Sequence, residues 1–178
     1  MTSEADNISQ RATAGGIHHV AYATRDTAAT VHFYEELLGF PLVNTEMQGT
    51  SLGFMRHLFF DTGDGVCIAF FELHQMGERD DFATDISDAN GLPVWVNHIA
   101  FAATSERQEQ VRATMDTAGV EPLMEVDHGW CHSLYYLDPN GIMVELCRDT
   151  PGITPDSERA HALLTTAPPE PAAPSSVR

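Results

Sequence analysis

Lysine is absent from this chain of 178 residues, and basic residues are scarce altogether. Nine arginines stand against 26 aspartates and glutamates, which gives a formal net charge of -17 at pH 7. Nucleic acids and anionic membrane surfaces attract proteins through lysine and arginine, so this charge argues against both as partners. The composition favours a small molecule as the partner.

Cysteine and long apolar runs are scarce too. The three cysteines, Cys67, Cys131 and Cys147, form no CxxC motif, and their number suits neither a disulfide framework nor a zinc-thiolate cluster. A reducing cytoplasm is therefore the expected compartment. No stretch approaches the roughly 18 apolar residues of a transmembrane helix, and the polar N-terminus does not resemble an export signal.

One supersecondary pattern occurs twice in the chain. In the first copy we expect a strand at 17–23, a helix capped by Asp26 and ended by Gly39, and strands at 41–47, 54–61 and 66–73. In the second we expect a strand at 96–102, a helix with Ser105 and Gln108 as a capping box, and strands at 122–126, 133–137 and 142–147.

The predicted fold class is therefore α+β, with two βαβββ modules at residues 17–73 and 95–148. Residues 1–16 are expected to be a flexible N-terminus and residues 74–94 a linker or mobile loop. Residues 149–178 are rich in alanine and proline, and this composition predicts a disordered tail.

A histidine and a glutamate recur in the same order in each module. His19 lies in HVAYA and His98 in HIAFA, and the glutamates are Glu72 in FEL and Glu145 in VEL. The offset between copies falls from 79 residues at the histidines to 73 at the glutamates, as small insertions would cause. A histidine packed in the core is the alternative for His19 taken alone, but a glutamate buried in an apolar strand needs a compensating partner.

These four side chains predict a divalent metal centre. Imidazole nitrogen and carboxylate oxygen suit Fe(II), Mn, Ni, Co or Zn, whereas calcium prefers oxygen ligands alone. Four protein ligands leave two positions open on an octahedral ion, which is typical of a catalytic centre.

The chain resembles the vicinal oxygen chelate superfamily, which includes glyoxalase I, extradiol dioxygenases, fosfomycin-resistance proteins and methylmalonyl-CoA epimerase. The resemblance covers about residues 16 to 148 and is carried by HVA with Asp26 seven residues after His19, FYEELLGF at 33–40, NHIAF at 97–101 and YLDPNGIMVE at 136–145. It implies that the two modules form an eight-stranded cup around a metal. It also implies His19, Glu72, His98 and Glu145 as ligands, and a homodimer in which one cup is closed within a chain or shared between two.

A second cluster precedes Glu145, in the segment HGWCHSLY at 128–135. Tyr135 lies ten residues before Glu145, a spacing similar to that of the active-site tyrosine in extradiol dioxygenases. We therefore take His128, His132 and Tyr135 as candidate catalytic residues, since imidazoles titrate near neutral pH. The alternative is that Tyr135 is a strand aromatic and His128 an exposed loop residue.

Three functions remain open at this point. The first is a ring-cleaving Fe(II) dioxygenase acting on a catechol-like aromatic diol, for which Glu72 is one ligand too many. The second is a glyoxalase-like lyase, isomerase or epimerase. The lack of lysine argues against those members of this class that bind anionic substrates, namely glutathione-dependent glyoxalases and fosfomycin-resistance proteins. The third is a protein that sequesters a drug or aromatic ligand, which has no need of buried acids.

Overall fold

The computed structural model describes residues 16–63, 65–77 and 79–168, and it confirms the repeated order of elements. The first module contains β1 (His19–Thr24), α2 (Thr27–Val31), η1 (His32–Leu37), β2 (Leu42–Gly49), β3 (Phe54–Gly63) and β4 (Val66–His74). The second contains β5 (His98–Ala102), α4 (Ser105–Thr117), β6 (Met124–Asp127), β7 (Cys131–Leu137) and β8 (Met143–Asp149). The expected flexible N-terminus lies almost wholly outside the described residues.

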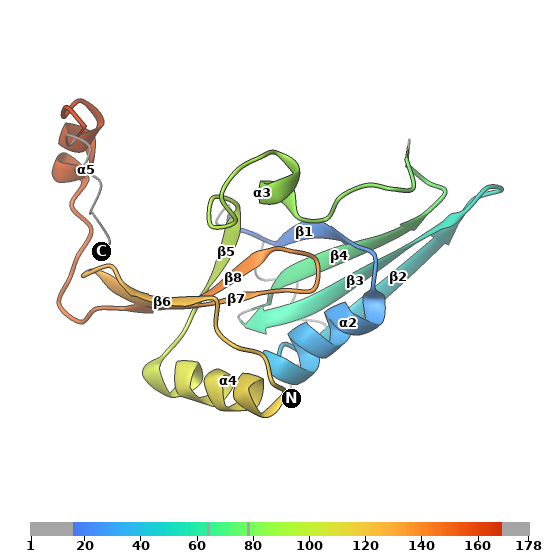
Figure 1. Ribbon diagram of the computed structural model, residues 1–178, viewed down its shortest axis with the longest axis horizontal. Helices are drawn as coiled ribbons and strands as arrows, with labels where there is room; N and C mark the ends of the chain where they lie inside the picture. The colour runs from blue at the N-terminus through green and yellow to red at the C-terminus, as the bar shows by residue number, and fades with distance from the viewer. Residues whose placement is uncertain (1–15, 64, 78, 169–178) are drawn as a thin grey trace, which may run out of the picture.

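Each module forms its own four-stranded sheet (Figure 1). The strand orders are β1-β4-β3-β2 and β5-β8-β7-β6. The first strand of each module runs parallel to the last, and the other neighbours are antiparallel. The expected α+β architecture of two modules is thereby confirmed, with two open sheets and no closed barrel among the described residues.

The helices begin and end close to the expected residues. Asp26 caps α2 by accepting a hydrogen bond from the Ala29 amide at 2.9 Å, and Gly39 ends the helical segment with φ +68°. In the second module the cap is Thr104, one residue before the expected Ser105, because the Thr104 hydroxyl accepts from the Arg107 amide at 3.2 Å.

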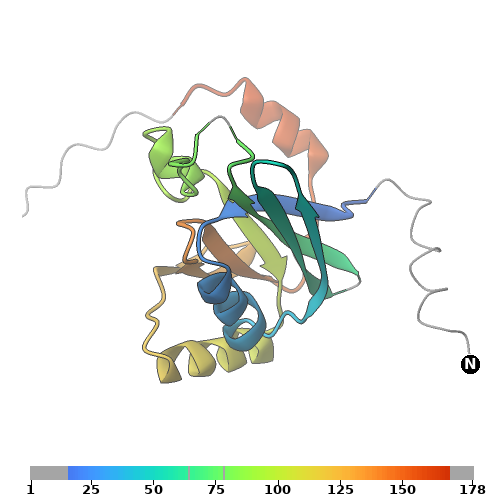
Figure 2. The same ribbon diagram turned by 90° about the vertical axis from the view of Figure 1, so that its right-hand side faces the viewer.

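One hydrophobic core joins both modules, and the helical segments α2–η1 and α4 lie side by side below the sheets (Figures 1 and 2). Phe40 contacts Phe101 across the modules, with ring centroids 4.8 Å apart. The core draws one face from each sheet, and its strand members are Leu58, Phe60, Ile68, Phe70, Phe101, Leu134, Tyr136, Val144 and Leu146. We call this side of each sheet the helix face and the other side the helix-free face.

A buried polar contact also ties the modules together. Tyr34 donates from its hydroxyl to Asp138 Oδ2 at 3.0 Å, and the Asn140 amide side chain donates to Thr30 Oγ1 at 3.2 Å. Asp138 Oδ1 accepts from the backbone amides of Asn140 and Ile142, and these two hydrogen bonds stabilise the DPNG turn at 138–141. Burial raises the pKa of Asp138 despite these hydrogen bonds.

Two segments expected to lack structure contain short helices. Within the linker, α3 spans Ile86–Ala89, and the Ser87 hydroxyl accepts from the Asn97 amide at 3.0 Å. Within the tail, α5 spans Ser157–Leu164 and buries none of its residues, so it extends from the body of the molecule (Figure 1). Among the described residues no helix is long and apolar enough to span a membrane.

Candidate metal centre

Strand alternation decides which side chains share a face. In the second module, His98 begins β5, and Ala100 two residues later pairs with Glu145 of β8. Glu145 also pairs with Tyr135 of β7. Because successive side chains alternate, His98, Glu145 and Tyr135 all lie on the helix-free face.

His98 and Glu145 are in direct contact. His98 Nε2 lies 3.0 Å from Glu145 Oε2, while His98 Nδ1 lies 2.8 Å from the backbone carbonyl oxygen of Trp95. A carbonyl only accepts, so Nδ1 carries the proton and Nε2 is left to face the carboxylate. Glu145 is 5% exposed, and its other oxygen, Oε1, accepts from the Ser133 hydroxyl.

This geometry fits a metal ion. Nitrogen and oxygen ligands about 2.1 Å from one ion, at a right angle, lie about 3.0 Å apart, which is the spacing between His98 Nε2 and Glu145 Oε2. The Trp95 carbonyl and the Ser133 hydroxyl orient the His98 and Glu145 side chains, as supporting partners do in metal sites. The donor pair therefore suits a divalent ion of the Fe, Mn, Co, Ni or Zn type.

Tyr135 and His128 form a second pair beside it. The Tyr135 hydroxyl lies 3.0 Å from His128 Nε2, and the Tyr135 ring lies edge-on to the His98 ring at 6.3 Å between centroids. Burial raises the pKa of Tyr135, and the nearby Glu145 carboxylate raises it further, against a hydrogen bond with Ser133 that lowers it. Tyr135 is therefore a protonated phenol at neutral pH.

His132 lies on the other side of the sheet. It alternates with Ser133 and so falls on the helix face, where its carbonyl accepts from the Gln108 side chain of α4 at 3.0 Å. Its ring nitrogen Nε2 is 3.6 Å from Asp127 Oδ1. The structure thus separates His132 from the two other candidate catalytic residues.

In the first module, His19 lies on the helix-free face together with His57 and Phe59. Its ring centroid is 5.5 Å from that of Phe59 and 6.1 Å from that of His57, and its Nδ1 is 2.8 Å from His18 Nδ1. Within the described part of the chain, no hydrogen bond, ion pair or ring contact joins His19 to His98 or Glu145, so His19 does not form a cluster of metal donors with them.

Glu72 is not on this face. It pairs with Thr24 and Arg56, and these residues alternate with His19 and His57, so Glu72 lies on the helix face. Its carboxylate accepts from Arg56 Nη1 at 2.6 Å and contacts His74 Nε2 at 2.9 Å. There it lines a cavity of about 370 Å³ with Arg25 and other residues, away from His19.

The register identifies Ala69 as the counterpart of Glu145. Ala69 pairs with Ala21, two residues after His19, just as Glu145 pairs with Ala100, two residues after His98. The expected pairing of Glu72 with Glu145 therefore does not match the strand register. The first module has alanine where the second has its carboxylate.

Sequence reasoning missed His57 as a functional candidate. It is 7% exposed, its Nε2 has no hydrogen-bond partner among the described residues, and its ring stacks on Phe71 at 3.7 Å between centroids. Burial lowers the pKa of His57, and the His19 ring lowers it further. A signal was present in the sequence, because His57 alternates with the apolar residues Leu58 and Phe60 and therefore lies on the opposite face of its strand from them.

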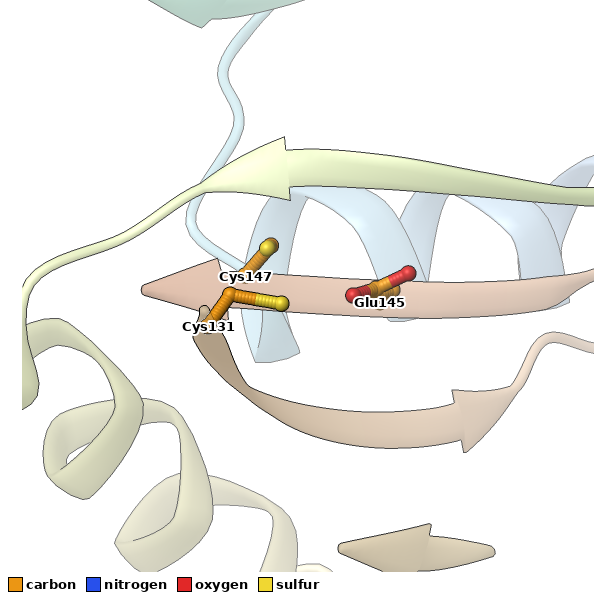
Figure 3. Close-up of side chains that lie close together, drawn as sticks. All are labelled: Cys131, Glu145 and Cys147. Carbon is orange, nitrogen blue, oxygen red and sulfur yellow. The ribbon is translucent and has the colours of Figure 1, made fainter. Parts of the chain in front are cut away.

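Cys131 and Cys147 also lie on the helix-free face of the second module, close to Glu145 (Figure 3). One donor atom each from Cys131, Cys147 and Glu145 lie within 4.8 Å of one another, and this is the one such cluster among the described residues. Burial raises the pKa of Cys147 to about 12, so its thiol is protonated and a poor nucleophile at neutral pH.

Comparison with solved structures supports the fold. A glyoxylase/bleomycin resistance protein/dioxygenase domain from Frankia sp. EAN1pec is 20% identical, with a TM-score of 0.58, covering 79% of this chain and 96% of that one. The fosfomycin resistance protein FosX from Listeria monocytogenes is 23% identical, with a TM-score of 0.54 and coverages of 78% and 97%. A lactoylglutathione lyase from Agrobacterium tumefaciens is 20% identical, with a TM-score of 0.52 and coverages of 76% and 95%.

The family assignment rests on the sequence itself. The profile of the Glyoxalase/Bleomycin resistance protein/Dioxygenase superfamily matches residues 16–146, which include both modules up to Glu145 and Leu146 in β8. That match covers most of the chain, and it agrees with the two four-stranded sheets of the βαβββ modules. The chain belongs to the Glyoxalase/Bleomycin resistance protein/Dioxygenase superfamily.

Proposed function

We propose that this protein is a metal-dependent, extradiol-type ring-cleaving dioxygenase acting on a catechol-like aromatic diol. The observation that carries the proposal is the donor set: His98 and Glu145 in contact, His19 on the corresponding strand, and Ala69 in place of a second carboxylate. Two histidines and one carboxylate leave three positions of an octahedral ion open, and Fe(II) oxygenases use such sets. The extra ligand that counted against this chemistry, Glu72, lies on the other face.

The ion would be held by His19, His98 and Glu145, with Fe(II) favoured. When bound, it supplies Lewis acidity for two neighbouring oxygens of a diol and open positions for both diol and dioxygen. Ser133 and the Trp95 carbonyl keep the Glu145 and His98 side chains in the orientation that binding needs.

Proton movement falls to three side chains. Tyr135 and His128 share one hydrogen bond, so a proton can reside on the phenol oxygen or on Nε2, and the pair can accept or return the proton of a diol hydroxyl. His57 has a free, buried Nε2 on the face of His19, and its lowered pKa keeps it neutral and ready to accept a proton.

The surroundings favour a flat, uncharged substrate. Trp130 and Trp95 are 59% and 56% exposed, and the Trp130 ring lies 6.4 Å from that of His128. The two strand arginines, Arg56 and Arg148, alternate onto the helix faces, where they contact Glu72 and Gln108. Among the described residues, the strands of the helix-free faces therefore present no arginine for a phosphonate or a glutathione carboxylate.

We propose further that the working unit is a homodimer with shared sites. His19 of one copy would join His98 and Glu145 of a second copy, since these groups are not in contact within one chain. Mixing a His19→Ala copy with a Glu145→Gln copy tests this sharing. A shared site predicts activity in the mixture from two inactive parents, whereas a site within one chain predicts none.

Lyase or isomerase chemistry is the alternative. It is favoured by the similarity to the lactoylglutathione lyase and to a FosX complex that contains Mn(II) and a dihydroxypropylphosphonic acid. A glutamate of the centre would then act as base on a carbon beside a chelated carbonyl. A binding protein that sequesters aromatic ligands is the third candidate.

Anaerobic reconstitution with Fe(II), Mn(II), Ni(II) and Zn(II), followed by O2 uptake with a panel of catechols, tests the proposal. We expect Fe-dependent uptake with a yellow ring-fission product, lost in His98→Ala and reduced at least a hundredfold in Tyr135→Phe. Bound metal without O2 uptake would favour the lyase or isomerase alternative. Tight aromatic binding without any metal would favour the sequestering protein.

A further inference from the structure

The thiol pair beside Glu145 is not used by the proposed reaction. Cys131 is 1% exposed at the start of β7, and Cys147 lies on β8 two residues after Glu145 (Figure 3). The Ser133 hydroxyl lies 3.6 Å from Cys131 Sγ and also donates to Glu145 Oε1. Oε2 of the Glu145 carboxylate therefore faces His98, and Oε1 faces Ser133 and the two cysteines.

The register argues against a disulfide between these cysteines. Cys147 pairs with Ser133, and Cys131 pairs with Asp149, so the two cysteines are diagonal neighbours. Diagonal Cα atoms on antiparallel strands lie about 7–8 Å apart, beyond the roughly 4.4–6.8 Å that a disulfide spans. Forming the bond requires movement of the β7–β8 backbone.

A metal ion bridges the same two sulfurs without that movement. Two thiolates at about 2.3 Å from a tetrahedral zinc ion are about 3.8 Å apart, and the donor atoms of Cys131, Cys147 and Glu145 already lie within 4.8 Å of one another. Two sulfurs and one carboxylate oxygen favour a thiophilic ion over Fe(II) or Mn(II).

We propose that Cys131, Cys147 and Glu145 form a second coordination site, for a thiophilic divalent cation of the zinc class. Each thiol gives up its proton to solvent as the ion binds. Since Glu145 belongs to both sets, an ion held by the thiols draws this carboxylate away from His98. Only this last consequence rests on the proposed function.

Cadmium titration followed by ultraviolet absorption tests the site, because cadmium bound to thiolates gives a charge-transfer band. We expect one ion per chain with this band in the wild type, and no band in the Cys131→Ser/Cys147→Ser double variant. Cys67→Ser is the matched control, since Cys67 lies on the other sheet, and it keeps the band. Glu145→Gln keeps the band but lowers the cadmium affinity at least tenfold.

The absence of a band in the wild type, or its persistence in the double variant, would contradict the proposal. The single variants Cys131→Ser and Cys147→Ser, each expected to show a weakened band, cover the case in which the double variant does not fold. His98→Ala separates this inference from the proposed function: it should lose Mn(II) binding and keep the cadmium band. Failure of the dioxygenase assay leaves the cadmium result unaffected.

Discussion

Glu145 is held between two partners whose chemistry differs. His98 Nε2 lies 3.0 Å from Oε2, whereas Ser133 donates its hydroxyl proton to Oε1. An ion can occupy the space at Oε2, while Ser133 keeps the carboxylate from rotating. In the proposed centre, the affinity for the metal ion therefore depends on the hydrogen bond that orients Glu145 as well as on the Glu145 carboxylate itself.

Replacing Ser133 with alanine tests this contribution. We expect Ser133→Ala to weaken Mn(II) binding by roughly 10- to 100-fold, the usual cost of losing a group that orients a ligand. Thr45→Ala on the exposed strand β2 is the control and should leave the affinity unchanged. Isothermal titration calorimetry measures both, and equal affinities for the two variants would refute the role of Ser133.

The Glu72 carboxylate stabilises the fold through its contacts, and its pKa makes this stabilisation depend on pH. Burial raises the pKa of Glu72, but the hydrogen bond with His74 and the charge of Arg56 oppose burial, and the pKa lies below its ordinary value. A lowered carboxyl pKa stabilises the fold above the ordinary glutamate pKa, and this stabilisation is lost as the pH falls through the folded-state pKa.

We therefore expect Glu72→Gln to lower the free energy of unfolding by about 1 kcal/mol at pH 7, since the Arg56 pair is partly screened by solvent. The difference from the wild type should shrink as the pH falls below about 4. Urea denaturation between pH 3 and 7 measures it. A difference that grows in acid would contradict the assigned contacts.

At the scale of strands and turns, the sequence predicted the two modules well, but the expected match of Glu72 with Glu145 differs from the strand register. Apolar alternation, the Asp26 cap and the glycines that end helices marked nearly every element. Glu72 and Ala69 lie three residues apart on one strand, however, and only the cross-strand register distinguishes them. The turn glycines Gly65 and Gly141 are 76 residues apart, and counting from them gives Ala69 as the match to Glu145.

Contacts that depend on how strands pair were beyond the sequence. The approach of Cys131 to Cys147 and the separation of His132 from Tyr135 require knowledge of which strands are neighbours and in what register. His57 was within reach, because alternation from Phe59 places it on the same face. A lone histidine in a strand is usually packed in the core, however, so its position on that face does not by itself indicate a function.

The DPNG turn depends on one glycine. Gly141 has φ +77°, and a Cβ there would lie 2.5 Å from the Asp85 Cβ. Gly119 has a similar φ of +73° with no atom within 4 Å of such a Cβ. We expect Gly119→Ala to cost about 1–2 kcal/mol from backbone conformation alone, and Gly141→Ala to cost roughly 3 kcal/mol or more because the clash adds to it. Thermal unfolding compares them, and equal losses would contradict the contact with Asp85.

For the whole molecule, the two modules should unfold as one unit, because the core and the contact of Tyr34 with Asp138 cross between them. Tyr34→Phe removes the hydroxyl that donates to a buried carboxylate, so we expect a loss of about 1–2 kcal/mol in a single transition. Tyr136→Phe is the matched control and should be neutral or stabilising, since the buried Tyr136 hydroxyl has no hydrogen-bond partner in the part of the chain that the structure describes. Two separate calorimetric transitions in the wild type would show that the modules are independent.

The same architecture leaves the helix-free faces of both sheets available for the proposed site, with His19 on one and His98 and Glu145 on the other. Everything proposed about function depends on these three side chains acting on one ion, with Glu72 outside it.

The most direct measurement is therefore Mn(II) affinity, by electron paramagnetic resonance, in four single variants. His19→Ala, His98→Ala and Glu145→Gln should each lose at least a hundredfold in affinity, and Glu72→Gln should bind as the wild type does. Loss of binding in Glu72→Gln, or full binding in Glu145→Gln, would contradict the account.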